Sequence, residues 1–181
     1  MPYKLYTAVL LLAAASFSAT AISASTPSIG NLINERLSLM KDVAGYKAQH
    51  HQAVEDLQQE KKVLESATAD ADSLGLKGES VRPFIQAQMD AAKAIQYRYR
   101  ADWLASPEPG WQPRPLAQVR PQIAQLSSQI LQRLAERLRT GPLGEADRAA
   151  FMASVDQVNL SAADKRRLAD ALLAVRTGSA R

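Results

Sequence analysis

Residues 34–47 read NERLSLMKDVAGYK, and this stretch decides the fold because its apolar residues recur with the period of a helix. Arg36 and Lys47 lie eleven residues apart, which is close to three helical turns, so the two side chains point within about 20° of one direction. The apolar residues that share this face are Ile29, Leu32, Ile33, Leu39, Met40 and Val43. The pattern predicts a helix from about residue 28 to 52 that carries an Arg and a Lys on its buried side.

The rest of the chain is also helical in pattern, and we predict an all-α bundle of about six helices. The further predicted helices are 53–73, 81–104, 117–139, 145–157 and 161–176. Glycines in LGLKGES (74–80) and TGPLG (140–144) predict loops, and the prolines of SPEPGWQPRPL (106–116) predict a long crossover. Runs of alternating β-branched residues, which are typical of strands, are absent from the sequence.

The composition narrows the class of function. The sequence has 22 basic and 18 acidic residues, dispersed along the chain, so it lacks the basic patch that a nucleic-acid-binding protein would show. It has no Cys, which excludes disulfides, thiolate metal sites and Cys nucleophiles. Gly-rich phosphate loops, HExxH and GxSxG are also missing. We therefore expect no metal and no cofactor.

The N-terminus predicts export. One Lys precedes an apolar run from Ala8 to about Phe17, and Ala19-Thr20-Ala21 fits a small-x-small cleavage site. We predict a signal peptide over residues 1–21, with cleavage possible as late as about residue 25, followed by a single domain over 22–181. The run is too short to remain as a membrane span, so the location is a bacterial periplasm or the exterior. A buried N-terminal helix and an uncleaved anchor are the alternatives.

Two later predicted helices also carry a polar residue on their apolar face. Gln96 lies in the middle of the apolar face of 81–104, and Arg120 lies on the apolar line of 117–139. Burying an unpaired charge is very costly, so such groups must pair with one another or face a cavity that holds a ligand. The excess of cations predicts a dianionic or polycarboxylate ligand inside the bundle. Alternatively, aliphatic stems pack inward while the charged heads reach solvent.

Three stretches together resemble the all-helical chorismate mutases, and more narrowly their exported, periplasmic class. They are NERLSLMKDVAGYK (34–47), VEDLQQEKKVL (54–64) and QAQMDAAKAIQYRYRADW (86–103). The resemblance covers about residues 29–140 and implies a chorismate mutase type II bundle, with residues 141–181 as a helical cover. It also implies an active site within a single chain, a homodimer and no cofactor.

The resemblance assigns roles to the inward-facing polar residues. Arg36 would bind a substrate carboxylate. Lys47 would contact a carboxylate and the ether oxygen of the breaking bond, and Gln96 would donate to the same oxygen. Arg120 stands where the exported class places an Arg that replaces the partner subunit's Arg of the intracellular enzymes.

On the helix 53–73, Glu60 would meet the ring hydroxyl of the substrate, with Asp56 nearby. The chain departs from the family at two positions of the pocket. Many members have Arg where this chain has Gln59, and many have Ser or Thr where it has Ala92. These departures imply fewer direct contacts to the substrate.

The implied reaction, chorismate to prephenate, is a pericyclic rearrangement that needs no nucleophile. The protein must select the compact substrate conformer and stabilise negative charge on the ether oxygen with fixed donors. With an amide at residue 96, activity should be flat across neutral pH, since a Glu there would have to be protonated to donate. The alternative function is a non-catalytic periplasmic binding or chaperone-like module.

Overall fold

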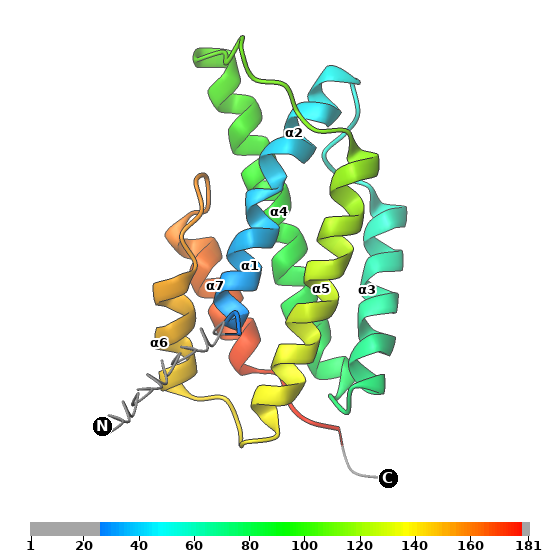
Figure 1. The fold of residues 1–181 in the computed structure, drawn as a ribbon, viewed down its shortest axis with the longest axis vertical. Coiled ribbons are helices and arrows are strands. Elements are labelled where there is room, and N and C mark those ends of the chain that lie inside the picture. The colour runs from blue at the N-terminus through cyan, green and yellow to red at the C-terminus, as the bar shows by residue number, and fades with distance from the viewer. Residues whose placement is uncertain (1–25, 179–181) are drawn as a thin grey trace, which may run out of the picture.

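A computed structural model describes residues 26–178, which form seven α-helices (Figure 1). The helices are α1 (Ile29–Ser38), α2 (Met40–Gln49), α3 (Leu57–Ser73), α4 (Gly78–Ala105), α5 (Leu116–Leu138), α6 (Glu145–Ser154) and α7 (Ala162–Leu173). Within the described range, the only β-pairing is an isolated bridge between Leu76 and Thr177. The all-α class is confirmed, and the predicted signal peptide lies outside the described residues.

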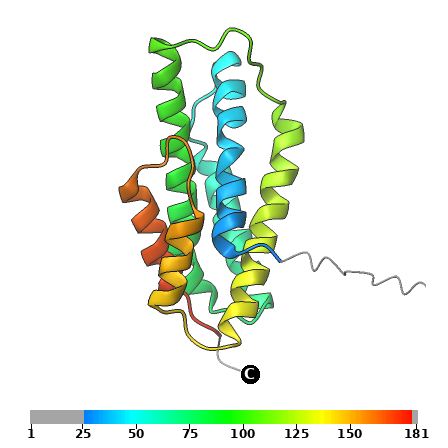
Figure 2. The same ribbon diagram turned by 60° about the vertical axis from the view of Figure 1, so that its left-hand side comes forward.

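The predicted helix 28–52 is two helices rather than one. Leu39 separates α1 from α2, but its backbone stays in the right-handed helical region (φ −68°, ψ −14°). The two helices therefore continue in nearly the same direction, as the blue and cyan helices of Figure 2 show. Ser28 fixes the start of α1, because its hydroxyl accepts a hydrogen bond from the Asn31 N–H at 3.1 Å. If α1 and α2 are counted as one interrupted helix, residues 26–178 contain the predicted number of about six helices.

Capping side chains move two other helix starts away from the predicted positions. The Asp56 carboxylate accepts from the Gln59 N–H at 3.1 Å, so α3 begins at residue 57 instead of 53. The Asp72 carboxylate accepts from the Gly78 N–H at 2.8 Å, and α4 begins one turn earlier than predicted. The helices α6 and α7 end about three residues before the predicted positions.

The long helix α4 runs through the middle of the bundle. It packs against α2 and α3 on one side and against α7 on the other, while α1 packs against α5 and α6 (Figure 1). The core at these contacts is aliphatic and aromatic, with side chains such as Ile33, Phe84, Ile95 and Leu134 fully buried. None of the helices in residues 26–178 combines the length and apolarity that crossing a bilayer requires. The α6–α7 pair covers one flank, and α3 and α5 stand on the other.

The crossover before α5 is fastened to α2. Asp42 accepts from the Arg114 N–H at 2.9 Å and from its Nε at 2.8 Å. Trp111 packs on Gly45, where an added Cβ would lie 2.6 Å from the indole ring. Gly45 is therefore required for this close approach, because any larger residue would clash with the Trp111 ring. These contacts fix where α5 begins, and hence where Arg120 stands.

Candidate active site

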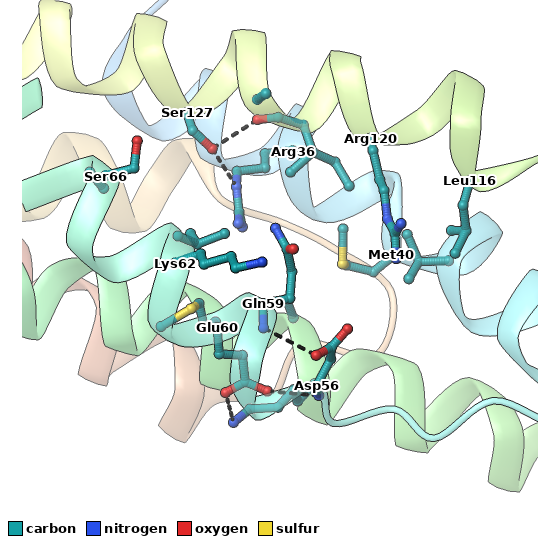
Figure 3. Close-up of a pocket in the computed structure, with 18 of the residues that line it drawn as sticks. Arg36, Met40, Asp56, Gln59, Glu60, Lys62, Ser66, Leu116, Arg120 and Ser127 are labelled. Carbon is teal, nitrogen blue, oxygen red and sulfur yellow. Dashed lines mark hydrogen bonds and ion pairs between the residues drawn. The ribbon is translucent and has the colours of Figure 1, made fainter.

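A cavity of about 660 Å³ lies between α1–α2, α3, α4 and α5 (Figure 3). Its volume falls within the range of small-molecule sites. All eight residues that the sequence places at the site line this cavity: Arg36, Lys47, Asp56, Gln59, Glu60, Ala92, Gln96 and Arg120. Helices far apart in the chain thus bring these residues to one place.

Arg36 is a buried cation that forms no ion pair with the other residues of the described range 26–178. Its side chain comes from the last turn of α1, and the residue is only 7% exposed. Nε donates to Ser127 Oγ at 3.1 Å, while Nη1 is buried and has no hydrogen-bond partner among residues 26–178. Burial lowers the pKa of Arg36 to about 10, which still leaves it charged at neutral pH. A buried, uncompensated guanidinium on a cavity wall is suited to binding an anion.

Gln96 is the second buried polar group with unused hydrogen-bonding capacity. It is 5% exposed, and its amide nitrogen donates to the Ala92 backbone oxygen, one turn earlier on α4, at 3.1 Å. The same nitrogen lies 3.8 Å from Met40 Sδ. Its Oε1 is buried and has no partner within the described part of the chain. An amide NH₂ carries two hydrogens, and the one that faces the weakly accepting Met40 sulfur is the one that a ligand oxygen could take over.

Lys47 is half-buried and held by the loop that precedes α3. Its Nζ donates to the Val54 backbone oxygen at 2.7 Å, which leaves two ammonium hydrogens. Burial lowers the pKa of Lys47, the Asp56 carboxylate opposes this shift, and the Arg120 guanidinium adds to it. Lys47, Asp56 and Arg120 therefore share one end of the cavity.

The two carboxylates at the start of α3, Asp56 and Glu60, are satisfied inside the protein. Asp56 caps the helix, and its own N–H faces Glu60 Oε1 at 3.4 Å. The other Glu60 oxygen accepts from Lys93 Nζ at 2.9 Å, and this hydrogen bond raises the pKa of Lys93. Figure 3 shows these contacts below the cavity, opposite Arg36 and Arg120. Asp56 and Glu60 are thus part of a paired network and are not free charges.

The prediction that Arg120 is buried is wrong. The residue is exposed, although its side chain reaches into the pocket from α5 (Figure 3). Leu116, one turn earlier on the same face, is buried, so Arg120 has the predicted direction, and its exposure reflects its position only five residues into α5. For Arg120, an aliphatic stem with a solvated head describes the side chain better than full burial.

The chain is similar in sequence to known proteins over most of its length. The model of the family described as chorismate mutase type II matches residues 20–97. The chain is 54% identical over 157 residues to the secreted chorismate mutase of Yersinia pestis, covering 86% of this chain and 84% of that protein. It is 43% identical over 152 residues to the monofunctional chorismate mutase of Enterobacter agglomerans, covering 84% of each. The chain belongs to the chorismate mutase type II family.

Solved structures agree with this family assignment. The crystal structure of the secreted Yersinia pestis mutase superposes with a TM-score of 0.77 at 52% identity, covering 82% of this chain and 97% of that one. The chorismate mutase of Burkholderia thailandensis gives 0.66 at 27% identity, covering 80% and 94%. The predicted family and its all-helical fold are confirmed.

Sequence reasoning missed several residues of this mutase pocket. Lys62, Lys93 and Ser127 all line it, yet each sits in a stretch that reads as ordinary solvent-facing helix. The one available signal was spacing: Lys62 lies three residues after Gln59, and Ser127 lies seven after Arg120. Among residues 26–178 no cluster of three His, Asp or Glu side chains could hold a metal ion.

Proposed function

We propose that this chain is an exported chorismate mutase that rearranges chorismate to prephenate in the pocket of a single chain. The observation that carries the proposal is the set of unused polar groups around one cavity. Within the described part of the chain, Arg36 has no counter-ion, Gln96 Oε1 has no hydrogen-bond partner, and Lys47 keeps two ammonium hydrogens for a ligand. A client-binding or chaperone-like module would gain nothing from burying such groups, which cost stability unless a ligand meets them.

The charge of the pocket suits a dianion. Five cations and three carboxylates line it, which leaves two positive charges. Lys93 and Glu60 neutralise one another, so the excess resides on the cations that face the cavity. Arg36 lies at the Ser127 level of α5, whereas Arg120 lies seven residues earlier, about 10 Å along the helix. The two carboxylates of chorismate would be held at these two levels, which selects the compact conformer.

The bond rearrangement itself needs only fixed donors. Lys47 and Gln96 would both donate to the ether oxygen as negative charge develops there. Each group is already anchored by one hydrogen bond, Lys47 to the Val54 oxygen and Gln96 to the Ala92 oxygen. Little reorganisation is then required when the transition state forms, and this kind of preorganised electrostatics is usually the largest catalytic contribution.

Location and assembly complete the proposal. The secreted relative from Yersinia pestis supports a periplasmic or extracellular enzyme. A signal peptide over residues 1–21 and a homodimer are the corresponding expectations for this chain. All eight predicted site residues line the pocket from this one chain, which supports an active site within a single chain.

The direct test is turnover of chorismate. Purified protein without its first 21 residues is mixed with chorismate, and the loss of chorismate ultraviolet absorbance is followed with the uncatalysed reaction as control. We expect rapid loss of the signal and formation of prephenate. Loss no faster than the uncatalysed rate at micromolar protein would contradict the proposed activity.

A further inference from the structure

We propose that Lys62 is a further substrate-binding residue, which holds from α3 the same carboxylate that Arg36 binds from α1. The inference rests on the proposed mutase function, because it assigns a contact for the substrate of that pocket. The helical spacing that places Arg36, Lys47 and Gln96 on buried faces does not predict this role for Lys62.

The position of Lys62 on α3 points it into the pocket. Gln59, Lys62 and Ser66 follow one another at spacings of three and four residues, so they lie on one face of the helix, and all three line the cavity. Figure 3 shows the Lys62 side chain extending from α3 toward the interior on the side of Arg36. The neighbouring Lys61 differs: it is absent from the cavity lining, and its side chain is 77% exposed beside Glu65.

The level of Lys62 along the pocket matches that of Arg36. Arg36 is bound to Ser127, two turns along α5 from Arg120. Lys62 is six residues beyond Asp56, about 9 Å along α3. Figure 3 places Asp56 and Arg120 toward one end of the cavity and Arg36 with Lys62 toward the other.

The charges at the Arg36 end are not neutralised by the protein. Among residues 26–178, neither Arg36 nor Lys62 forms an ion pair, and the nearby Glu60 is already paired with Lys93. Two cations that flank one part of a cavity repel each other until an anion lies between them. The Lys62 ammonium, on the wall opposite Arg36, would give the substrate carboxylate a second charged hydrogen-bond donor beside the Arg36 guanidinium.

The same geometry gives Lys62 a compensating role. Gln59 stands one turn before it on the same wall and carries no charge. A cation at residue 62 supplies to this wall the positive charge that an amide at residue 59 cannot. Because Lys62 is exposed and flexible, its contribution should appear mainly in substrate affinity and depend on salt.

The experiment compares Lys62→Met with Lys61→Met, the matched control on the same turn, and with the rescue variant Lys62→Arg. Steady-state kinetics with chorismate at low and high salt give kcat and KM, and calorimetric titration with prephenate gives affinity without turnover. For Lys62→Met we expect KM and the prephenate Kd to rise about tenfold at low salt, while kcat stays within about threefold of the wild type. At high salt the difference in KM and Kd between Lys62→Met and the wild type should be smaller. Lys62→Arg should recover most of the affinity, and Lys61→Met should match the wild type.

Equal prephenate affinity in Lys62→Met and Lys61→Met would overturn the inference. So would a loss of thermal stability in Lys62→Met that accounts for its weaker binding, since that would make Lys62 structural. Failure of the proposed function is seen separately, as a wild-type protein that does not accelerate the loss of chorismate. The titration with prephenate still decides the role of Lys62 in that case.

Discussion

The polar residues on the two walls of the pocket differ in whether the protein supplies their hydrogen-bond partners. On the wall formed by α1 and α4, Arg36 and Gln96 are buried and keep polar atoms without partners in the described chain. On the α3 wall, Asp56 and Glu60 are more exposed, and each is engaged by hydrogen bonds within the protein. Arg36 Nη1 and Gln96 Oε1 on the buried wall have no hydrogen-bond partner among residues 26–178, although burial makes that expensive.

This difference separates function from stability. Groups that lack partners in the folded protein lower its stability, and they are explained by a ligand that supplies the missing contacts. Groups that cap a helix or close an ion pair are explained by the fold itself. Substitutions of Arg36 or Gln96 should therefore reduce catalysis more than stability, and substitutions of Asp56 or Glu60 should do the reverse.

The largest effect is expected for Lys47→Ala. The change removes an ammonium that contacts the ether oxygen in the transition state, so kcat should fall by at least about a thousandfold. The loop before α3 loses one hydrogen bond, to the Val54 oxygen, and helicity should be nearly unchanged. Chorismate kinetics and circular dichroism measure the two quantities. A variant with near-normal turnover would refute the role of Lys47.

The next effect is expected for Gln96→Glu. A carboxylate at this buried position cannot donate to the ether oxygen, so kcat at pH 7.5 should fall by about a hundredfold. Protonation restores a donor, and burial favours the neutral acid, so activity should recover as the pH is lowered. The wild type should show no such recovery and should be flat between pH 5 and 8. A steep change of wild-type activity across that range would count against Gln96 as the donor.

A smaller effect is expected on the alkaline side of the wild-type profile. The pKa of Lys47 is lowered below its ordinary value of 10.5, chiefly by burial. Activity needs the charged form, so it should fall as the pH rises toward this lowered pKa, earlier than an ordinary Lys would allow. The Asp56 carboxylate opposes the shift, so Asp56→Asn should move the alkaline fall to lower pH. An unmoved profile in Asp56→Asn would show that the two groups are not coupled.

The smallest effect on turnover, and the clearest on stability, is expected for Asp56→Ala. Loss of the helix cap should reduce the free energy of unfolding by about 1 kcal/mol. Asp56→Asn is the matched control, because Asn also caps helices and should keep most of that stability. Urea unfolding of the two variants gives the comparison. Equal stability of Asp56→Ala and the wild type would mean that the α3 wall is not held by its cap.

Much of this arrangement could be predicted from the sequence, because helical periodicity fixes the direction of each side chain. The eleven-residue spacing of Arg36 and Lys47 and the apolar neighbours of Gln96 were sufficient to turn all three inward. Periodicity does not say how deep a residue lies along the bundle. Arg120 has the predicted direction but is exposed, because α5 begins only four residues before it.

Partnerships across the bundle could not be predicted in the same way. Ser127 meets Arg36 across 91 residues of chain, and Lys93 meets Glu60 across 33. These contacts depend on which helices become neighbours, and no local pattern records that. Lys62 was missed for a related reason: α3 has a thin apolar stripe, and only the three-residue spacing from Gln59 distinguished Lys62 from Lys61.

The most direct test of the contrast between the walls is Arg36→Met, measured for stability and activity together. Met fills a similar volume without the charge, and Ser127 keeps its own hydrogen bond to the Ile123 oxygen at 2.8 Å. We expect kcat/KM for chorismate to fall by at least about a hundredfold, while the free energy of unfolding stays unchanged or rises by about 1 kcal/mol. Activity within a few-fold of the wild type, or a loss of about 3 kcal/mol of stability or more, would show that Arg36 serves the fold rather than the substrate.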